Sequence, residues 1–413
     1  MVVYWLLACL IIIYLATMRR FDFFSIGVIS FLLYTSPCFW GDTYIPGIYY
    51  GAISDDTYLA VNSMLMVIFL SMIIYDLVTR IPDNKIGTDI ISVRFQVSMN
   101  LLTLLSIAAM MYTIYDLGFL NLVNSKRVIS GQINTVSYGF SLWSALVVFT
   151  YGKITKKNII LLVSLIPIFF NLFIGSRSFA ATVFIIYFLL LWYNDRQFIV
   201  RNKKSIVFSF VTFLGILVYK EIYKVVKTFD LGLIGSILTD SSTYTKIFKL
   251  EETQVVLSTL NYVLDIDYKL SYYEAIARIV SVIPFANNYI TDVSIRFSSL
   301  VKNEIFDAHY GLASNIWAET YSMGGYLGMY IMVCLWIVLL MQGNKMLNKG
   351  TVLQKIFLIP AFVQVAFYIH RLDFVQIVAI YKQILLIFII WIFLYMIAPI
   401  FIARKETALE GVE

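Results

Sequence analysis

The sequence predicts an all-α, polytopic integral membrane protein. Of its 413 residues, 60% are hydrophobic and 14% are charged, and the mean hydropathy is +0.83. A soluble chain carries about 25% charged residues, whereas here the apolar residues fall in blocks long enough to cross a bilayer. These values exclude a water-soluble globular enzyme, a disordered chain and a coiled coil.

Hydropathy places about eleven transmembrane helices in a single membrane domain that covers residues 1–413. The first eight lie within 1–220 and the last three within 313–399, and residues 400–413 follow as a cytoplasmic tail. The expected spans are 2–18, 22–40, 58–78, 98–117, 136–151, 159–174, 178–193, 206–220, 313–341, 356–370 and 376–399.

Lys and Arg concentrate in every second loop, and the positive-inside rule makes those loops cytoplasmic. The first such loop holds Arg19 and Arg20, whereas residues 41–57 of the following loop hold no Lys or Arg. We therefore expect the N-terminus outside and the C-terminus in the cytoplasm. The net charge of +6 follows from this topology and does not indicate nucleic-acid binding.

Residues 221–312 form one large loop, expected on the outer side, with no stretch long enough to span. Its apolar pieces 255–264 and 276–286 are interpreted as interfacial or re-entrant segments. The cytoplasmic loops are short and hold no candidate site, whereas long structured loops tend to carry function. The sequence therefore places the function of this protein at the outer face.

Disulfide and metal chemistry are not indicated. Cys9, Cys38 and Cys334 lie in apolar blocks without paired spacing. Asp265 and Asp267 of the large loop could bind a divalent metal, but an acidic turn is the favoured interpretation. We expect no metal and no cofactor.

Basic residues gather on the expected outer side, where the positive-inside rule disfavours them. Guanidinium groups match phosphate oxygens in bidentate geometry, so this set suggests an anionic ligand. Arg177 is the strongest candidate for anion binding, because the tight turn at residues 175–178 places it beside a helix N-terminus, which favours anions. The alternative is an arginine that only anchors a hairpin at the membrane surface. The set comprises Lys126, Arg127, Arg177, Lys220, Lys224, Lys227, Arg278, Arg296 and Arg371.

A second candidate cluster begins with Asp307, His309 and Tyr310 and continues into the next span. On a helix, Asn315, Glu319 and Ser322 share one polar face. A carboxylate in an apolar span is costly unless it is paired or used, so Glu319 is either a functional group or a structural partner to an outer arginine. His309 could be a general base, although exposed loop histidines are usually idle.

Two further features are a pair of glycines at helix-packing spacing and a polar turn before the last span. Gly324 and Gly328 have the small-xxx-small spacing that permits close helix packing. The turn that contains His370, Arg371 and Asp373 also lies on the expected outer side.

These features resemble the O-antigen polymerases (Wzy), which polymerise the oligosaccharide repeat units of bacterial surface polysaccharides. The architecture of the whole chain is similar, and the sequence motifs cover about fifty residues. They comprise the Gly-Ser-Arg turn at 175–177, the stretch from Arg278 to Pro284, and the pattern Asn315, Glu319, Tyr321, Gly324, Gly325 and Gly328.

The resemblance implies an enzyme of the bacterial cytoplasmic (inner) membrane with its active site facing the periplasm. It would transfer the growing chain from undecaprenyl diphosphate onto a new lipid-linked repeat, without a metal. It would thus be a membrane-embedded, lipid-donor glycosyltransferase similar to the GT-C type. Membrane lipids and a polysaccharide chain-length regulator are implied as partners, and nucleic acid is not.

The resemblance also suggests roles for particular residues. Arg177, supported by Arg278 and Arg296, would stabilise the diphosphate leaving group. Glu319 or His309 would take the proton of the acceptor hydroxyl. The remaining candidates for substrate binding are Asn315, Tyr321, His370 and Arg371.

Two rival functions stay open at this point. An O-antigen ligase uses the same donor but typically presents a histidine near residues 313–315, which this sequence lacks, although His309 is close. A transporter or flippase of lipid-linked oligosaccharide should line a path with polar groups at mid-membrane depth. Here the charges crowd one face instead. A purely structural scaffold would not explain the outer arginines.

Overall fold

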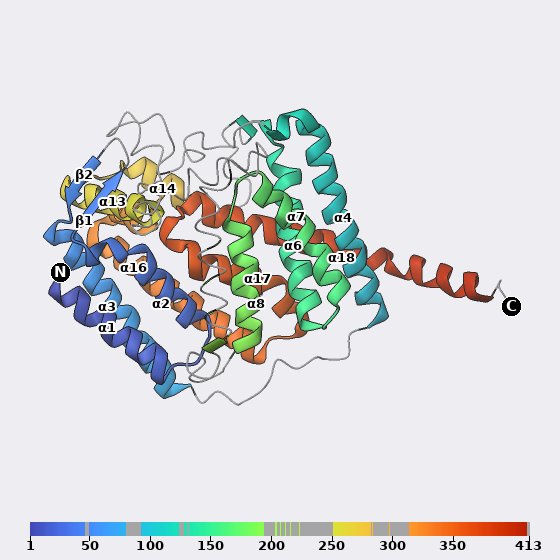
Figure 1. Cartoon of the computed structure of the whole chain (residues 1–413), viewed down its shortest axis with the longest axis horizontal. Helices are drawn as coiled ribbons and strands as arrows, with labels where there is room; N and C mark the ends of the chain where they lie inside the picture. Colours follow the sequence, from blue (N-terminus) through green and yellow to red (C-terminus); the bar gives the residue numbers. More distant parts are fainter. Residues whose placement is uncertain are drawn as a thin grey trace.

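The computed structural model describes residues 1–45, 49–79, 92–123, 128–129, 132–193, 251–281 and 314–410, together with residues 203, 204, 207, 211, 215, 223, 283 and 297. Within them the chain is mostly helical, and the helices pack as a bundle (Figure 1). The helices are α1 (Val2–Thr17), α2 (Phe23–Tyr34), η1 (Ser36–Phe39), α3 (Asp55–Val78), α4 (Val93–Leu117), η2 (Phe119–Val123), α6 (Thr135–Ile154), α7 (Asn158–Phe173), α8 (Ser178–Trp192), α13 (Glu251–Asp265), α14 (Tyr272–Val280), α16 (Ile316–Lys349), α17 (Val352–Tyr368), η6 (Ile369–Arg371) and α18 (Phe374–Glu410).

Five helical stretches are long and apolar enough to cross a membrane. They are α3, α4, α16, residues Val352–Arg371 and residues Phe374–Ile402. Four shorter apolar helices, α1, α2, α7 and α8, accompany them. The prediction of a helical membrane protein is therefore confirmed, but the count of about eleven spans is not. The predicted span 206–220 lies outside the described residues except for residues 207, 211 and 215.

The predicted span 22–40 is shorter than expected. Its helix, α2, has 12 residues and ends at Tyr34, and at 1.5 Å per residue it is about 18 Å long against a hydrocarbon core of about 30 Å. Pro37 follows in the 3₁₀ turn η1, and proline lacks the N–H that a continuing helix needs.

A β-hairpin, which the all-α prediction omits, comes next. Strands β1 (Asp42–Ile45) and β2 (Tyr49–Ala52) pair antiparallel, with Thr43 opposite Gly51. Their aromatic and β-branched residues favour strands. The Thr43 hydroxyl donates a hydrogen bond to the Gln254 carbonyl at 3.0 Å, so the hairpin is attached to α13.

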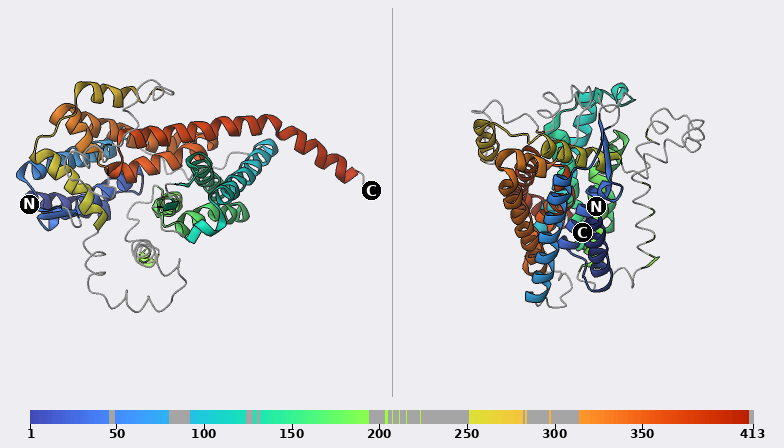
Figure 2. Two further views of the ribbon diagram at one scale, coloured as in Figure 1. Left: turned by 90° about the horizontal axis from the view of Figure 1, so that it is seen from above. Right: turned by 90° about the vertical axis from the view of Figure 1, so that its left-hand side faces the viewer.

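Helix α17 joins two groups of helices. On one side it packs against α2 and α16, and on the other against α6 and α8, while α18 packs against α4, α6 and α17. Residues 141–152 of α6 are all buried, which makes it a central helix of its group. Helix α18 extends beyond the bundle (Figure 2), so the segment predicted as a tail from residue 400 continues the helix to Glu410.

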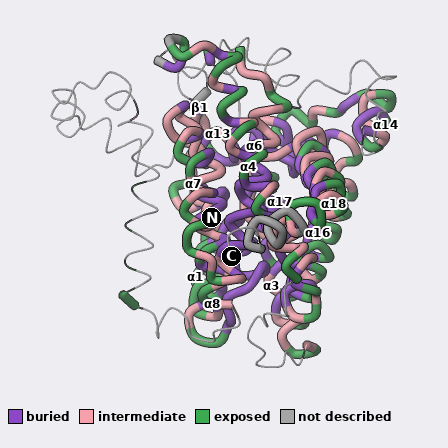
Figure 3. The backbone as a smooth tube through the Cα atoms, turned by 90° about the vertical axis from the view of Figure 1, so that its right-hand side faces the viewer, coloured by how far each residue is buried: buried purple, intermediate pink, exposed green. Residues whose placement is uncertain are grey.

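Helices α13 and α14, the hairpin, and the first residues of α8, α16 and α18 lie at one end of the bundle, named here the loop end. Helix α14 occupies the rim of the molecule (Figure 3). Its exposed apolar residues include Tyr272, Ile276 and Ile279, which form a stripe at helical spacing, while Arg278 faces inward and is buried. This pattern is typical of an interfacial helix.

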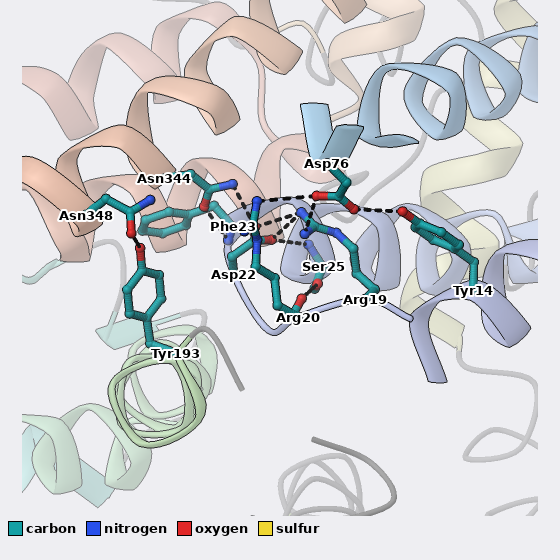
Figure 4. A network of polar contacts seen from close by, with 10 residues as sticks. All are labelled: Tyr14, Arg19, Arg20, Asp22, Phe23, Ser25, Asp76, Tyr193, Asn344 and Asn348. Atoms are coloured by element: carbon teal, nitrogen blue, oxygen red, sulfur yellow. Dashed lines mark hydrogen bonds and ion pairs between the residues drawn. The ribbon is translucent and has the colours of Figure 1, made fainter. Parts of the chain in front are cut away.

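At the opposite end, a buried ionic network joins α1, α2, α3 and α16 (Figure 4). Arg19 contacts Asp22 and Asp76, each at 2.7 Å. Asp22 caps α2 by accepting from the Ser25 N–H at 3.1 Å, and it also accepts from Asn344 Nδ2 at 2.9 Å. Arg19, expected as a loop residue, is therefore enclosed and neutralised.

Replacing Asp22 should destabilise the protein, because it leaves the buried Arg19 without one of its carboxylates. We expect Asp22→Ala to lower the free energy of unfolding by about 3–5 kcal/mol, measured by SDS titration of purified protein in micelles. Asp116→Ala, at an exposed position of α4, is the control and should change little. Equal stability of the two variants would contradict the structural role of this network.

Candidate functional site

The predicted site residues that the structure describes gather at the loop end, around the turn that precedes α18. Arg177 comes from the start of α8, Arg278 from α14, Asn315 and Glu319 from the start of α16, and Arg371 from η6. Segments that are far apart in the sequence thus meet here. Arg296 and His309 lie outside the described residues, as do Lys126, Arg127, Lys220, Lys224 and Lys227.

Glu319 is fully buried and accepts hydrogen bonds at both carboxylate oxygens. Arg278 Nη1 donates to Oε1, and the Phe374 N–H donates to Oε2 at 2.8 Å. The first bond is an ion pair in which Arg278 is also buried. One carboxylate therefore joins α14, α16 and α18, so the contacts favour the structural-partner interpretation of Glu319 in this state.

Local sequence explains how Arg278 reaches this position. Ser271 and Glu274 form a capping box that starts α14. The chain just before it is held by the Leu270 N–H, which donates to the Ser322 carbonyl at 2.9 Å. The guanidinium carbon of Arg278 lies 5.8 Å from the centroid of the Phe297 ring, within the range of a cation–π contact.

A second buried carboxylate, Asp373, fixes the start of α18. It accepts from the Gln376 N–H and the Ser314 hydroxyl, both at 2.9 Å, and from the Phe297 N–H at 3.3 Å. Its own N–H donates to Gln376 Oε1 at 3.1 Å. Asp373 is therefore a cap that holds the turn on which Arg371 stands.

Arg177 and Arg371 converge on a single carboxylate that the sequence analysis did not single out, Glu252 of α13. Arg177 Nη2 donates to Oε1, and Arg371 Nη1 donates to Oε2 at 2.9 Å. The two arginines, one on each side of the carboxylate, come from turns 194 positions apart in the sequence. Two members of the expected outer basic set thus lie together, and these three side chains carry a net charge of +1.

The turn that carries Arg177 has the tight geometry expected of it. Gly175 adopts φ +92°, a conformation that favours glycine, and Arg177 is the residue that precedes the first turn of α8. A Cβ atom at Gly175 would lie 2.7 Å from the Tyr223 ring. The turn thus depends on glycine for its conformation and for the close approach of Tyr223.

Asn315 has a structural role at the start of α16. Its side-chain oxygen accepts from the N–H groups of Trp317 and Ala318, and its Nδ2 donates to the Val256 carbonyl at 2.9 Å. The residue therefore caps α16 and attaches α13 to it.

Tyr321 belongs to a polar contact at the surface. Its hydroxyl donates to Asp267 Oδ1 at 2.6 Å, and Lys269 Nζ lies 3.7 Å from the ring centroid. Lys269 also pairs with Asp267 at 2.7 Å. Hydrogen bonds from Lys269 and Tyr321 hold the pKa of the Asp267 carboxyl below its usual range, so this carboxylate stays charged at neutral pH.

His370 lies in the aromatic core rather than at the surface of the site. It is buried, packs against Phe31 and Trp336, and accepts a hydrogen bond at Nδ1 from Trp317 Nε1 at 3.0 Å. This bond places the ring proton of neutral His370 on Nε2. These contacts hold His370 within the aromatic core.

Gly324 corrects one expectation. A Cβ atom added at Gly324 would meet no other atom within 4 Å, so this glycine does not serve close helix packing. Instead, Gly324 (φ −150°, ψ 21°) and Gly325 (φ +62°, ψ −154°) interrupt the helical dihedrals of α16. The glycines of this segment thus produce a kink just after the polar first turns.

Neither a metal centre nor a known relative helps to define the site. Among the described residues, no three His, Cys, Asp or Glu side chains gather as a metal would require. Family models, curated proteins and solved structures all lack a match to this chain.

The pairing of Arg278 with Glu319 should be visible as energetic coupling. Arg278→Met and Glu319→Gln should each cost about 3–5 kcal/mol, because each leaves one buried partner uncompensated. The double variant should cost less than the sum by more than about 1 kcal/mol. SDS unfolding of the four proteins measures this difference, and additive losses would show that the two side chains act independently.

Proposed function

We propose that this protein is a glycosyltransferase that polymerises oligosaccharide repeat units linked to undecaprenyl diphosphate at the outer face of a bacterial cytoplasmic membrane. The observation that carries the proposal is the convergence of Arg177 and Arg371 on one carboxylate at the loop end. Two guanidinium groups facing one small anion provide the donor pattern that phosphate oxygens require.

The reaction breaks the bond between the anomeric carbon of the growing chain and its diphosphate, and forms a bond to a hydroxyl of the new repeat. The diphosphate leaves on its lipid, and negative charge develops on the phosphate oxygen that had been bonded to the anomeric carbon. Arg177 and Arg371 would hold that charge in place, and fixed cations stabilise the transition state more than the ground state. Arg296, a further candidate, lies outside the described residues.

The acceptor hydroxyl must lose its proton to a base. Glu319 is a candidate, and because Arg278 and the Phe374 N–H occupy its oxygens in this structure, the acceptor would have to replace one of these donors. His309 is the other candidate and lies outside the described residues. Arg278 would then act on the diphosphate or keep Glu319 ionised.

The surroundings suit a lipid-borne sugar. Apolar helices beside the loop end would accommodate the polyprenyl chain, and the exposed stripe of α14 would lie among outer-leaflet lipids. Asp267 and Lys269, which are exposed beside the buried Tyr321, offer charged groups to sugar hydroxyls. A polysaccharide chain-length regulator is proposed as a partner, and the loop end is proposed to face the periplasm.

The test is polymerisation by purified protein in detergent, supplied with a lipid-linked repeat unit in the presence of EDTA. Wild type should produce a ladder of products on a gel. Arg177→Ala and Arg371→Ala should slow its formation by about 100-fold or more, the usual cost of removing a charge-stabilising donor. Arg94→Ala is the matched control, because Arg94 binds the Tyr395 carbonyl at the other end of the bundle.

The possible outcomes separate the rival functions. A ladder that survives the loss of both arginines would contradict their role. Transfer onto a lipid-A core in place of a new repeat would indicate the ligase. An absent ladder, with labelled lipid-linked sugar crossing the membrane of reconstituted vesicles, would indicate the transporter.

A further inference from the structure

Glu252 occupies the position between Arg177 and Arg371 that the proposed function gives to the diphosphate. We propose that Glu252 is a displaceable occupant of this anion site, which the diphosphate of the donor replaces when it binds. The inference rests on the proposed function and adds a role for a residue of the large loop.

The geometry supports displacement because the two carboxylate oxygens each take one arginine. A phosphate group presents oxygens at a similar spacing and carries more negative charge, so it can accept the same two hydrogen bonds more strongly. Glu252 thus offers the arginines two acceptor oxygens as the ligand would, but it carries less charge and is tethered to the chain.

Differences in exposure indicate which partner moves. The side chain of Arg177 is 14% exposed and that of Arg371 is 35% exposed, whereas that of Glu252 is 43% exposed. All three residues stand at helix ends: Arg177 precedes α8, Arg371 ends η6 and Glu252 is the second residue of α13. As the most exposed of the three side chains, the carboxylate is the one expected to move when an anion binds.

Displacement has a consequence that distinguishes it from a purely structural ion pair. If Glu252 competes with the diphosphate, removing its charge should strengthen anion binding. If Glu252 serves instead to position the arginines, removing it should weaken that binding. The sign of the change therefore decides between the two roles.

The experiment is calorimetric titration of inorganic pyrophosphate into the full-length protein in phosphatidylcholine nanodiscs at fixed ionic strength. Glu252→Gln should bind pyrophosphate roughly tenfold more tightly than wild type, within the usual range of coupling between competing ligands. Glu252→Ala should show the same direction. Glu274→Gln, which changes a carboxylate of the loop in the capping box of α14, should bind as wild type does.

Three results would overturn the inference. They are unchanged or weaker binding in both Glu252 variants, a gain that persists when Arg177→Ala or Arg371→Ala is added, and a gain for pyrophosphate that is absent for farnesyl diphosphate. The last would show that the anion displacing Glu252 is not borne by a lipid. Since binding is measured without turnover, a wild type that makes no ladder would contradict the polymerase and leave this measurement decisive.

Discussion

The loop end depends on one constraint, which is that a carboxylate buried among apolar helices must have every oxygen occupied. Glu319 meets it by accepting from Arg278 and from the Phe374 N–H. Satisfying this one group brings α14 against the first turn of α16 and fixes the start of α18. The turn held in this way carries Arg371. The position of the cluster formed by Arg177, Arg371 and Glu252 therefore depends on the contacts of Glu319. Asp373 reinforces the same turn from its other side by accepting from Ser314 and Gln376.

The opposite end of the bundle obeys the same constraint with a different result. There Arg19 is enclosed between Asp22 and Asp76, and Asn344 completes the network. Both arginines of this network are buried and only Asp76 is partly exposed, so the network offers no accessible cation. The cluster of Arg177, Arg371 and Glu252 is partly exposed, and its cations outnumber its anions. The partly exposed guanidinium groups of this cluster can take up an anion, whereas the arginines of the ionic network are enclosed, and this contrast is why the loop end is the candidate site.

Local patterns in the sequence were sufficient to predict part of this arrangement. The membrane class, the tight turn at Gly175 and the placement of Arg177 at a helix start all follow from nearby residues. The partner Glu252 lies 75 positions from Arg177, and no local pattern reports a contact at that distance. Spacing also misled at Gly324, where a motif for helix packing coincides with a kink. The burial of His370 was not predictable for a related reason, because only the fold shows that aromatic rings from several helices enclose it.

Ion pairs between arginine and glutamate attach the large loop to the helical bundle at two places. Arg278 attaches α14 through Glu319, and Glu252 attaches α13 through Arg177 and Arg371. Helix α13 is further joined to the hairpin by Thr43 and to α16 by Asn315. A ligand that released Glu252 would therefore loosen one end of α13 while the hairpin and α16 still held the rest of it. Anion binding at the arginines and the position of α13 would then be linked thermodynamically. Anything that favours the released state of Glu252 would also favour anion binding at Arg177 and Arg371.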